Sequence, residues 1–306
     1  MNTLIIGGSG HLSGTLALVA LGKGHTVWIV TRGNKPVPEG VTPLIADRKD
    51  HTALSAVIAG QDQVWDLVVD CICFDEADMR HDIELFRSRA RHFVFVSTDL
   101  VYHPSRRRFP QPAETGDYVR PEDALPAYGL KKRECEIALQ NADTGGMAWT
   151  IVRPCHIYGP RSELGCLPMH QRDPRIIHRI RAREAIRLVG GGRFLQQPIR
   201  ADDLCETILS ASGNRKAAGG IFNTAGPDII ESWHYYRIIA DTLGVPLEIE
   251  DLPVASALAE HPELAPSLCH RIYDLSPLAA AGLHVPATPI EIGLRLHING
   301  LLERQS

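Results

Sequence analysis

The first half of the chain alternates short apolar runs with helix-like stretches. The apolar runs are Leu4–Ile6, Val27–Val30, Pro43–Ala46, Leu67–Cys73, Phe93–Ser97 and Trp149–Val152. Helix-like stretches at Thr15–Leu21 and Lys131–Gln140 precede the second and the last of these runs. Continuous apolar runs that are bounded by turns and separated by helices indicate a parallel sheet buried on both faces. With right-handed crossovers, the pattern predicts a doubly wound α/β domain.

The second half has a different pattern. Segment 161–198 is rich in Arg, Pro and Gly, and a helix is predicted near Arg175–Arg187. A strand is predicted over Gly220–Gly226 and a helix over Glu231–Leu243. We therefore expect a smaller, mixed C-terminal domain at the carboxyl edge of the sheet. The expected boundaries are 1–160 with 199–228 for the larger domain, and 161–198 with 229–306 for the smaller one.

The last helix has a clear predicted start. Thr288 is a candidate N-cap, Pro289 stands at the first helical position, and Glu291 completes a capping box.

Composition narrows the classes of function. The 306 residues include 22% charged and 44% hydrophobic residues, as in ordinary globular proteins. Thirty-two basic and 36 acidic residues give a formal charge of −4, whereas a general nucleic-acid binder is usually basic. No apolar run is long enough to span a bilayer, and the N-terminus lacks the pattern of a signal peptide. We therefore expect neither a nucleic-acid partner nor a membrane.

The cysteines favour a reducing compartment. Their number, seven, is odd, so a complete disulfide framework is impossible and a cytoplasmic location is expected. Cys71 and Cys73 form a C-x-C pair, which suggests either a metal site or small buried side chains in a strand. No second pair follows at zinc-like spacing and no H-E-x-x-H pattern occurs, so no metal site is expected.

A glycine-rich turn follows the first strand. Gly7 and Gly10 allow backbone conformations and close approaches that a Cβ would block. The free N–H groups at the start of the next helix then face a pyrophosphate. The alternative is an ordinary strand–helix turn, but the strand–turn–helix context favours a dinucleotide site.

Two residues after later strands bear on the identity of the dinucleotide. No acid ends the second strand, where an NAD site usually holds the ribose 2′-hydroxyl; Arg32 stands there and suits a 2′-phosphate. NADP is therefore slightly favoured over NAD, with a solvated loop arginine as the alternative. Asp47, after the third strand, is either a contact of the adenine edge or a helix cap.

Candidate catalytic chemistry lies at Tyr128 and Lys132. Four residues apart, they share one helix face, and an ammonium beside a phenol is expected to lower the tyrosine pKa. Such a tyrosine exchanges protons near neutral pH, and a nicotinamide exchanges the hydride. Thr98 ends the fifth strand, where it can bond a substrate oxygen or simply make a local hydrogen bond.

Together, these residues resemble an extended short-chain dehydrogenase/reductase of the NAD-dependent epimerase/dehydratase superfamily. The motifs that carry the resemblance are Gly7–Gly14, Val96–Tyr102, Tyr128 with Lys132, Arg153–Pro160, Pro198–Leu204 and Phe222–Gly226. The resemblance covers nearly the whole chain and implies a Rossmann-like fold with a C-terminal substrate domain. It is highly specific for fold and cofactor, and only weakly specific for the substrate.

The resemblance also implies roles for individual residues. The catalytic set is Thr98, Tyr128 and Lys132. The implied cofactor contacts are Gly7, Gly10, His11, Leu12, Arg32, Asp47, Arg48, Cys71 and Lys132, with Pro154 and His156 beside the nicotinamide.

Three departures from the family pattern stand out. Arg200 replaces the histidine of an H-V-D-D-L motif, and Ser13 replaces a glycine. Leu100 stands where sugar-nucleotide 4,6-dehydratases carry a glutamate base, which disfavours a dehydratase of that type.

Arginines supply candidate substrate contacts. Asp99, Arg161, Arg193 and Arg200 are the expected contacts of a sugar that carries a negative group. Arg175, Arg179 and Arg183 form either the wet face of a helix or an anion-binding surface. The triplet Arg106–Arg108 is interpreted as part of a solvated loop.

The leading hypothesis is an NAD(P)-dependent epimerase or oxidoreductase that acts on a hydroxyl of a sugar or nucleotide sugar. A homodimer is one assembly that we consider for it. One alternative is a ketone reductase with a non-sugar substrate. Another is a non-catalytic member, since some relatives of the family bind RNA in chloroplasts. The acidic balance and the intact Thr98, Tyr128 and Lys132 argue against the latter.

Overall fold

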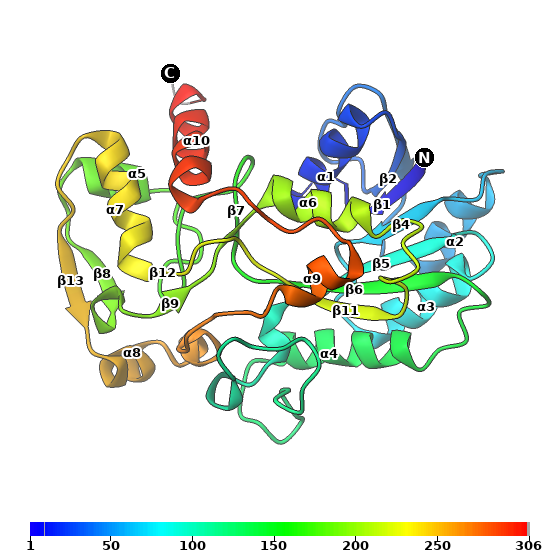
Figure 1. Ribbon diagram of the computed structural model, residues 1–306. Helices are drawn as coiled ribbons and strands as arrows, with labels where there is room; N and C mark the ends of the chain where they lie inside the picture. Colours follow the sequence, from blue (N-terminus) through cyan, green and yellow to red (C-terminus); the bar gives the residue numbers. More distant parts are fainter. Residues whose placement is uncertain (9, 305–306) are drawn as a thin grey trace.

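A seven-stranded parallel sheet forms the centre of the computed structural model, which describes residues 1–8 and 10–304 (Figure 1). Its strand order is β11-β6-β5-β4-β1-β2-β3. The strands are β1 (Asn2–Ile6), β2 (Thr26–Thr31), β3 (Val41–Ile45), β4 (Leu67–Asp70), β5 (His92–Val96), β6 (Ala148–Pro154) and β11 (Gly220–Thr224). The order reverses at β1 and β4, which confirms the doubly wound α/β prediction and places a crevice there.

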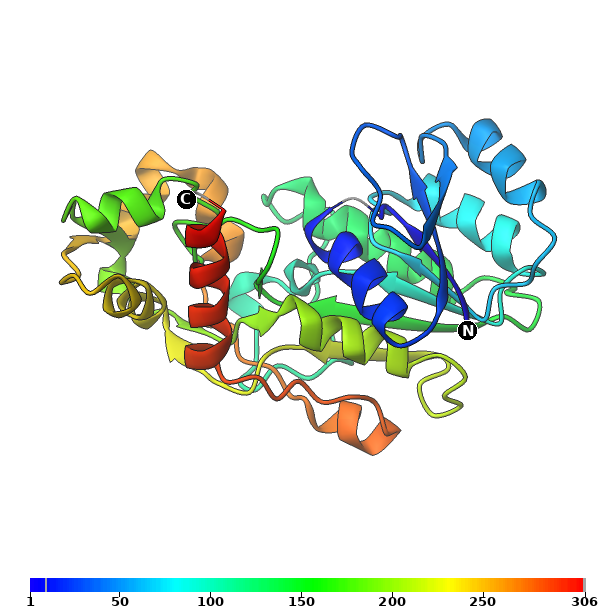
Figure 2. The ribbon, with the colours of Figure 1, turned by 90° about the horizontal axis from the view of Figure 1, so that it is seen from above.

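Helices cover both faces of the sheet (Figures 1 and 2). They are α1 (His11–Gly22) and α6 (Ala201–Ser210) on one face, and α2 (His51–Ala59), α3 (Glu76–Phe86) and α4 (Ala127–Gln140) on the other. Successive strand residues point to opposite faces. Ile5 therefore packs in one core cluster with Leu16 of α1, while Leu4 packs in the other with Leu54 of α2.

A third hydrophobic cluster lies beside the sheet. Its helices and strands include α5 (Ile176–Arg181), β8 (Ile186–Val189), α7 (Ser232–Leu243) and α10 (Ile290–Glu303), at the left of Figure 1. β8 pairs in parallel with β13 (Ile249–Leu252), and α8 (Val254–Glu260) follows. Two short pairs complete the strands: β7 (Ile157–Tyr158) with β10 (Ile199–Arg200), and β9 (Leu195–Gln196) with β12 (Ile230–Glu231).

One segment of the expected smaller domain packs elsewhere. Helix α9 (Ser276–Ala281) contributes Leu278 and Ala281 to the core cluster of the sheet, although it falls within 229–306. The short 3-10 turns are η1 (Asp99–Val101), η2 (Pro104–Arg106), η3 (Gly190–Gly192) and η4 (Pro262–Ser267). No helix within 1–8 and 10–304 is long and apolar enough to cross a membrane.

The fourth strand is shorter than predicted. It ends at Asp70, whose Oδ1 accepts hydrogen bonds from the backbone N–H groups of Ile72 (2.6 Å) and Cys73 (2.8 Å). These bonds turn the chain, so Cys71 and Cys73 lie after the strand rather than on one face of it.

Two helix predictions were also wrong in detail. The helix expected near Arg175–Arg187 ends at Arg181; Arg183 has a φ of 55°, and β8 begins three residues later. The predicted cap of the last helix is absent, because Thr288 bonds to Asp203 instead. Asp228, from a distant loop, accepts the N–H of Ile290 at 2.7 Å.

Candidate active site

The glycine turn lines a cleft of about 390 Å³ at the reversal of strand order. Gly7 has a φ of 101°, and a Cβ there would lie 2.8 Å from Cγ2 of Ile72, so only glycine fits. Ser13, which replaces the usual glycine, accepts a hydrogen bond from the N–H of Gly10 at 3.1 Å and donates to the carbonyl of Gly7. Ser9, also in this turn, lies outside the described residues.

The glycine-turn cleft gathers several predicted cofactor residues. It is lined by Gly7, Gly10, Val30, Thr31, Arg32, Asn34, Lys35, Ala46, Asp47, Arg48, Lys49, Ile72 and Phe74. Its glycine floor leaves room that a Cβ would fill, and exposed cations stand at its rim. These features fit a dinucleotide whose phosphates approach the backbone.

His11 fastens the start of α1 to another loop. Its Nδ1–H donates to the carbonyl of Pro160 at 2.8 Å. Burial lowers the pKa of His11 to about 4, so the imidazole is neutral at pH 7. The residue therefore joins the glycine turn to the segment that follows β7.

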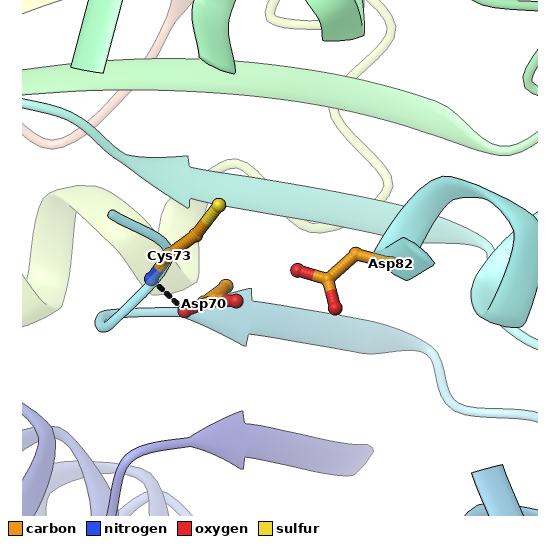
Figure 3. Close-up of side chains that lie close together, drawn as sticks. All are labelled: Asp70, Cys73 and Asp82. Carbon is orange, nitrogen blue, oxygen red and sulfur yellow. Dashed lines mark hydrogen bonds between the residues drawn. The ribbon is translucent and has the colours of Figure 1, made fainter. Parts of the chain in front are cut away.

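Arg48 lines the same cleft, but its guanidinium already forms hydrogen bonds with other residues of the protein. Its Nη2 donates to Asp70 (3.0 Å) and Asp82 (2.6 Å), and also to the carbonyl of Asp78 (3.1 Å). Figure 3 shows Asp70 and Asp82 beside Cys73. The atoms of these three side chains that could hold a metal ion lie within 4.8 Å of one another. Because the guanidinium of Arg48 already bonds both carboxylates, a metal ion would have to displace it.

A second cavity of about 510 Å³ lies at the carboxyl edge of the sheet. Phe74 lines both this sheet-edge cavity and the glycine-turn cleft, so the two adjoin. The cavity is lined by Leu12, Cys71, Phe74, Val96, Ser97, Thr98, Asp99, Leu100, Tyr128, Lys132, Pro154, Cys155, His156, Ile157, Leu167, Gln171, Arg172 and Arg271. The structure thus brings together Thr98, Tyr128 and Lys132 with the residues expected beside a nicotinamide.

Lys132 is almost fully buried in the wall of the sheet-edge cavity. Its Nζ donates to the carbonyl oxygens of Cys73 (2.9 Å) and Val96 (2.7 Å) and lies 4.5 Å from the centre of the Phe95 ring. Desolvation lowers the pKa of Lys132. The two carbonyls hold the ammonium at the end of β5.

Tyr128 stands at the mouth of the cavity with 43% of its surface exposed. Partial burial raises the pKa of its phenol, while hydrogen bonding with Thr98 and the charge of Arg172 oppose that rise. The expected lowering of this pKa by Lys132 is not seen, because the ammonium is directed at the two carbonyls.

A buried ion pair positions the helix that carries Tyr128 and Lys132. Glu136, one turn after Lys132, accepts two bonds from Arg153 (2.8 and 2.7 Å) and one from Ser97 (2.6 Å). Arg153 belongs to β6 and Ser97 follows β5, so one carboxylate ties α4 to two strands. Arg133 adds a further bond at 2.8 Å.

Sequence reasoning missed a second buried charge cluster. Asp99 bonds to Arg271 and Tyr273, and Arg107 donates to its carbonyl oxygen at 2.8 Å. The two guanidinium groups hold the pKa of Asp99 below its usual value. Arg107, expected in a solvated loop, is therefore buried in the core. Arg271 lies 172 residues from Asp99, and no local motif signals that contact.

The three arginines expected to contact substrate lie outside the lining of the sheet-edge cavity. Arg161 adopts a φ of 70° beside Gly14 of α1. Arg193 is exposed and pairs with Glu231 at 3.0 Å, and Arg200 pairs with Asp202 at 3.1 Å. Within the described chain, the arginines of the lining are instead Arg172 and Arg271, and Asp99 is the one expected contact found there.

Comparisons with solved structures support the fold. UDP-glucose 4-epimerase from Thermotoga maritima, solved with UDP-glucose, has a TM-score of 0.81 at 17% identity, with 100% of both chains covered. The UDP-glucose 4-epimerase of Thermus thermophilus, solved with NAD, has a TM-score of 0.76 at 17% identity, with 99% of both chains covered.

A curated relative differs in its described role. The Arabidopsis thaliana chloroplast stem-loop binding protein of 41 kDa b is 27% identical over 235 residues. The match includes 73% of this chain and spans 58% of the length of that relative.

The sequence profile of the NAD-dependent epimerase/dehydratase family matches residues 3–225, from the first strand through the last strand of the sheet. That range contains the glycine turn and the residues expected for catalysis. Family membership supports a nicotinamide cofactor. The chain belongs to the NAD-dependent epimerase/dehydratase family.

Proposed function

We propose that the protein is an NAD(P)-dependent epimerase or oxidoreductase that acts on a hydroxyl of a sugar or nucleotide sugar. The observation that carries this proposal is the junction of the two cavities. Thr98, Tyr128 and Lys132 line the sheet-edge cavity, and Phe74 joins that cavity to the glycine-turn cleft. A dinucleotide that follows the glycine turn therefore has a route to the tyrosine.

In this proposal, each catalytic side chain has a distinct task. The bound nicotinamide supplies the hydride chemistry. Thr98 would hold the substrate oxygen, and Tyr128 would exchange the proton of the reacting group. Its phenol, which the raised pKa keeps protonated near neutral pH, would donate that proton to the carbonyl oxygen in reduction, and the deprotonated form would accept the hydroxyl proton in oxidation. Lys132 would bond the cofactor ribose, and it already donates to the carbonyl oxygen of Val96 at the end of β5. Such a site would give an epimer if the ketone stayed bound and were reduced from its opposite face, and net oxidation if the ketone were released.

The resemblance also supports tasks for residues around the cofactor. Gly7, Gly10 and His11 would lie near its phosphates, Asp47 and Arg48 near its adenosine half, and Leu12, Cys71, Pro154 and His156 near its nicotinamide half. Leu12, Cys71, Pro154 and His156 all line the sheet-edge cavity, which supports this division.

We propose NADP as the preferred form of the cofactor. Arg32 is exposed at the rim of the glycine-turn cleft, and no carboxylate of residues 1–8 and 10–304 pairs with it. Lys35 lines the same rim. Both cations suit a 2′-phosphate, and no acid at the end of β2 would repel it.

The test is substitution of the proposed proton acceptor. Tyr128→Phe removes one hydroxyl, so turnover should fall by about 10²–10⁴-fold, the usual contribution of a general acid–base group. Cofactor affinity, measured by titration calorimetry, should persist. The matched control is Tyr158→Phe, since Tyr158 is buried in the third cluster. Normal turnover by Tyr128→Phe on a substrate found by screening sugars, nucleotide sugars and simple ketones would refute the assignment.

Stem-loop binding is a second candidate, favoured by the name of the Arabidopsis relative. The formal charge of −4 counts against it. A salt-sensitive gel shift with an RNA stem-loop, unaffected by Tyr128→Phe, would support it. A cytoplasmic location and a homodimer stay predictions.

A further inference from the structure

The sheet-edge cavity carries an excess of positive charge. Its lining includes Lys132, Arg172 and Arg271, and Asp99 is the one carboxylate found there among the described residues. A cavity with this balance attracts an anion and repels a cation.

The cluster around Asp99 does not neutralise itself. One carboxylate faces two guanidinium groups, from Arg107 and Arg271, and Tyr273 donates to it as well. Arg271 is 2% exposed, and its Nη1 has no hydrogen-bond partner within the described chain. Arginine stays protonated in proteins, so the surplus charge persists at every physiological pH.

Arg172 adds a second cation that no acid offsets. It is exposed, and no carboxylate of residues 1–8 and 10–304 lies within ion-pair distance of it. Its Nε donates to Oγ of Ser162 at 3.2 Å. The loop before it is anchored, because Cys166 exchanges two 2.9 Å hydrogen bonds with the hydroxyl of Tyr236. The guanidinium is thus held at the cavity without being neutralised.

Both arginines lie at the reacting end of the cavity. Asp99, which bonds Arg271, directly follows Thr98 in the chain. Burial, with smaller contributions from the charges of Arg271 and Arg172, lowers the pKa of His156 to about 3. The charge of Arg172 also opposes the rise in the pKa of Tyr128. An anion bound here would therefore sit close to the hydroxyl that reacts.

We propose that Arg172 and Arg271 bind an anionic group carried by the sugar ring itself, a carboxylate or a phosphate, beside Thr98 and Tyr128. This inference rests on the proposed function for the identity of the reacting ring. Guanidinium forks match the oxygen geometry of both groups, and the cluster supplies the charge before the ligand arrives. The two arginines thereby select acidic sugars over neutral ones.

Matched pairs of sugars test the inference on the full chain with saturating NADP or NAD. Calorimetry compares UDP-glucuronate with UDP-glucose, and glucuronate and glucose 6-phosphate with glucose. In at least one pair the anionic member should bind tenfold or more tightly than its neutral partner. Preference for the carboxylate or for the phosphate identifies which group the cavity takes.

Variants connect that preference to the two side chains. Arg172→Ala alters an exposed residue, so the fold should survive. It should abolish most of the difference in affinity between the anionic and the neutral sugar, by weakening only the binding of the anionic one. Arg271→Gln should have the same direction of effect, with Arg107 still paired to Asp99. Arg172→Lys should retain part of the preference. Arg175→Ala, three residues away and outside the cavity lining, should behave as wild type.

Three results would overturn the inference. Equal binding of both members of every pair would do so, whether or not turnover is found. Equal weakening of UDP-glucose and UDP-glucuronate by Arg172→Ala would assign the arginine to the diphosphate and leave the proposed function intact. A preference for acidic sugars that survives both variants would place the anion elsewhere. By contrast, failure of the proposed function appears separately, as normal turnover in Tyr128→Phe.

Discussion

The two cavities treat buried charge in opposite ways. Behind the glycine-turn cleft, Arg48 meets three aspartates, Asp70, Asp78 and Asp82. The excess negative charge is neutralised within the protein. Lys49 bonds Asp78 at 2.6 Å, and burial beside Asp70 raises the pKa of Asp82, which favours its protonated form.

At the sheet-edge cavity the excess is of arginine. Asp99 meets Arg107 and Arg271, and no second carboxylate joins them within the described residues. A carboxyl group can take up a proton when acids outnumber bases, but a guanidinium cannot release one. The acidic cluster around Arg48 is therefore neutralised internally and has a structural role. The basic cluster around Asp99 keeps a net positive charge that a ligand can pair with.

The largest expected effect separates these two clusters directly. Asp99→Asn leaves two buried guanidinium groups without a counter-charge, and breaking a buried pair in this way costs about 3–5 kcal/mol. Asp82→Asn replaces a carboxyl whose pKa is already raised with a neutral group of the same shape. Its cost should be about 1 kcal/mol, the net value of an ordinary hydrogen bond. Urea denaturation at pH 7.5 measures both.

Similar losses in the two variants would erase the contrast between the clusters. A larger loss in Asp82→Asn would reverse it and make Asp82 a charged partner of Arg48.

The second effect is pH-dependent and comes from His156. Its folded pKa of about 3 lies below the unfolded value near 6.5, so unfolding takes up a proton. The contribution of neutral His156 to the free energy of unfolding is therefore fully present above pH 6.5 and is lost as the pH falls from 6.5 towards 3. Between pH 7.5 and pH 5, this one histidine should lower the free energy of unfolding by about 2 kcal/mol.

Urea denaturation at pH 7.5 and pH 5 tests this sign. His156→Gln should lose about 2 kcal/mol less than wild type between the two pH values. His178→Gln, at an exposed position on α5, should follow wild type. If His156→Gln loses as much as wild type on acidification, burial beside the arginines is not what governs this histidine.

The contrast between the clusters also shows which parts of the molecule were predictable. Continuous apolar runs located six of the seven parallel strands within a few residues, because strands buried on both faces admit few polar residues. The seventh was predicted separately, as a strand over Gly220–Gly226. Thr98, Tyr128 and Lys132 were found because local spacing placed them at strand ends and on one helix face. All three line one cavity in the structure.

The missed features depend on contacts between distant parts of the chain. Arg271 reaches Asp99 across 172 positions, and Asp228 caps the last helix from 62 positions away. Arg107 looks like its neighbours Arg106 and Arg108 in sequence, yet it alone of the three is buried. Periodicity describes one element at a time, so it cannot assign a charged side chain to a partner in another element.

The smallest expected effect concerns the exposed rim of the glycine-turn cleft. Arg32 is solvated there, unlike the buried arginines at Asp99, so it has no desolvation cost and gains only a screened attraction to a 2′-phosphate. Arg32→Ala should weaken NADP binding by about tenfold, equivalent to about 1.4 kcal/mol, and leave NAD binding unchanged. Calorimetry with both cofactors at low and high salt measures this, and the tenfold difference should shrink as salt rises because the charge is exposed. Wild-type protein that binds NAD at least as tightly as NADP would remove Arg32 from cofactor selection. The glycine-turn site would remain, since its backbone cradle does not depend on that side chain.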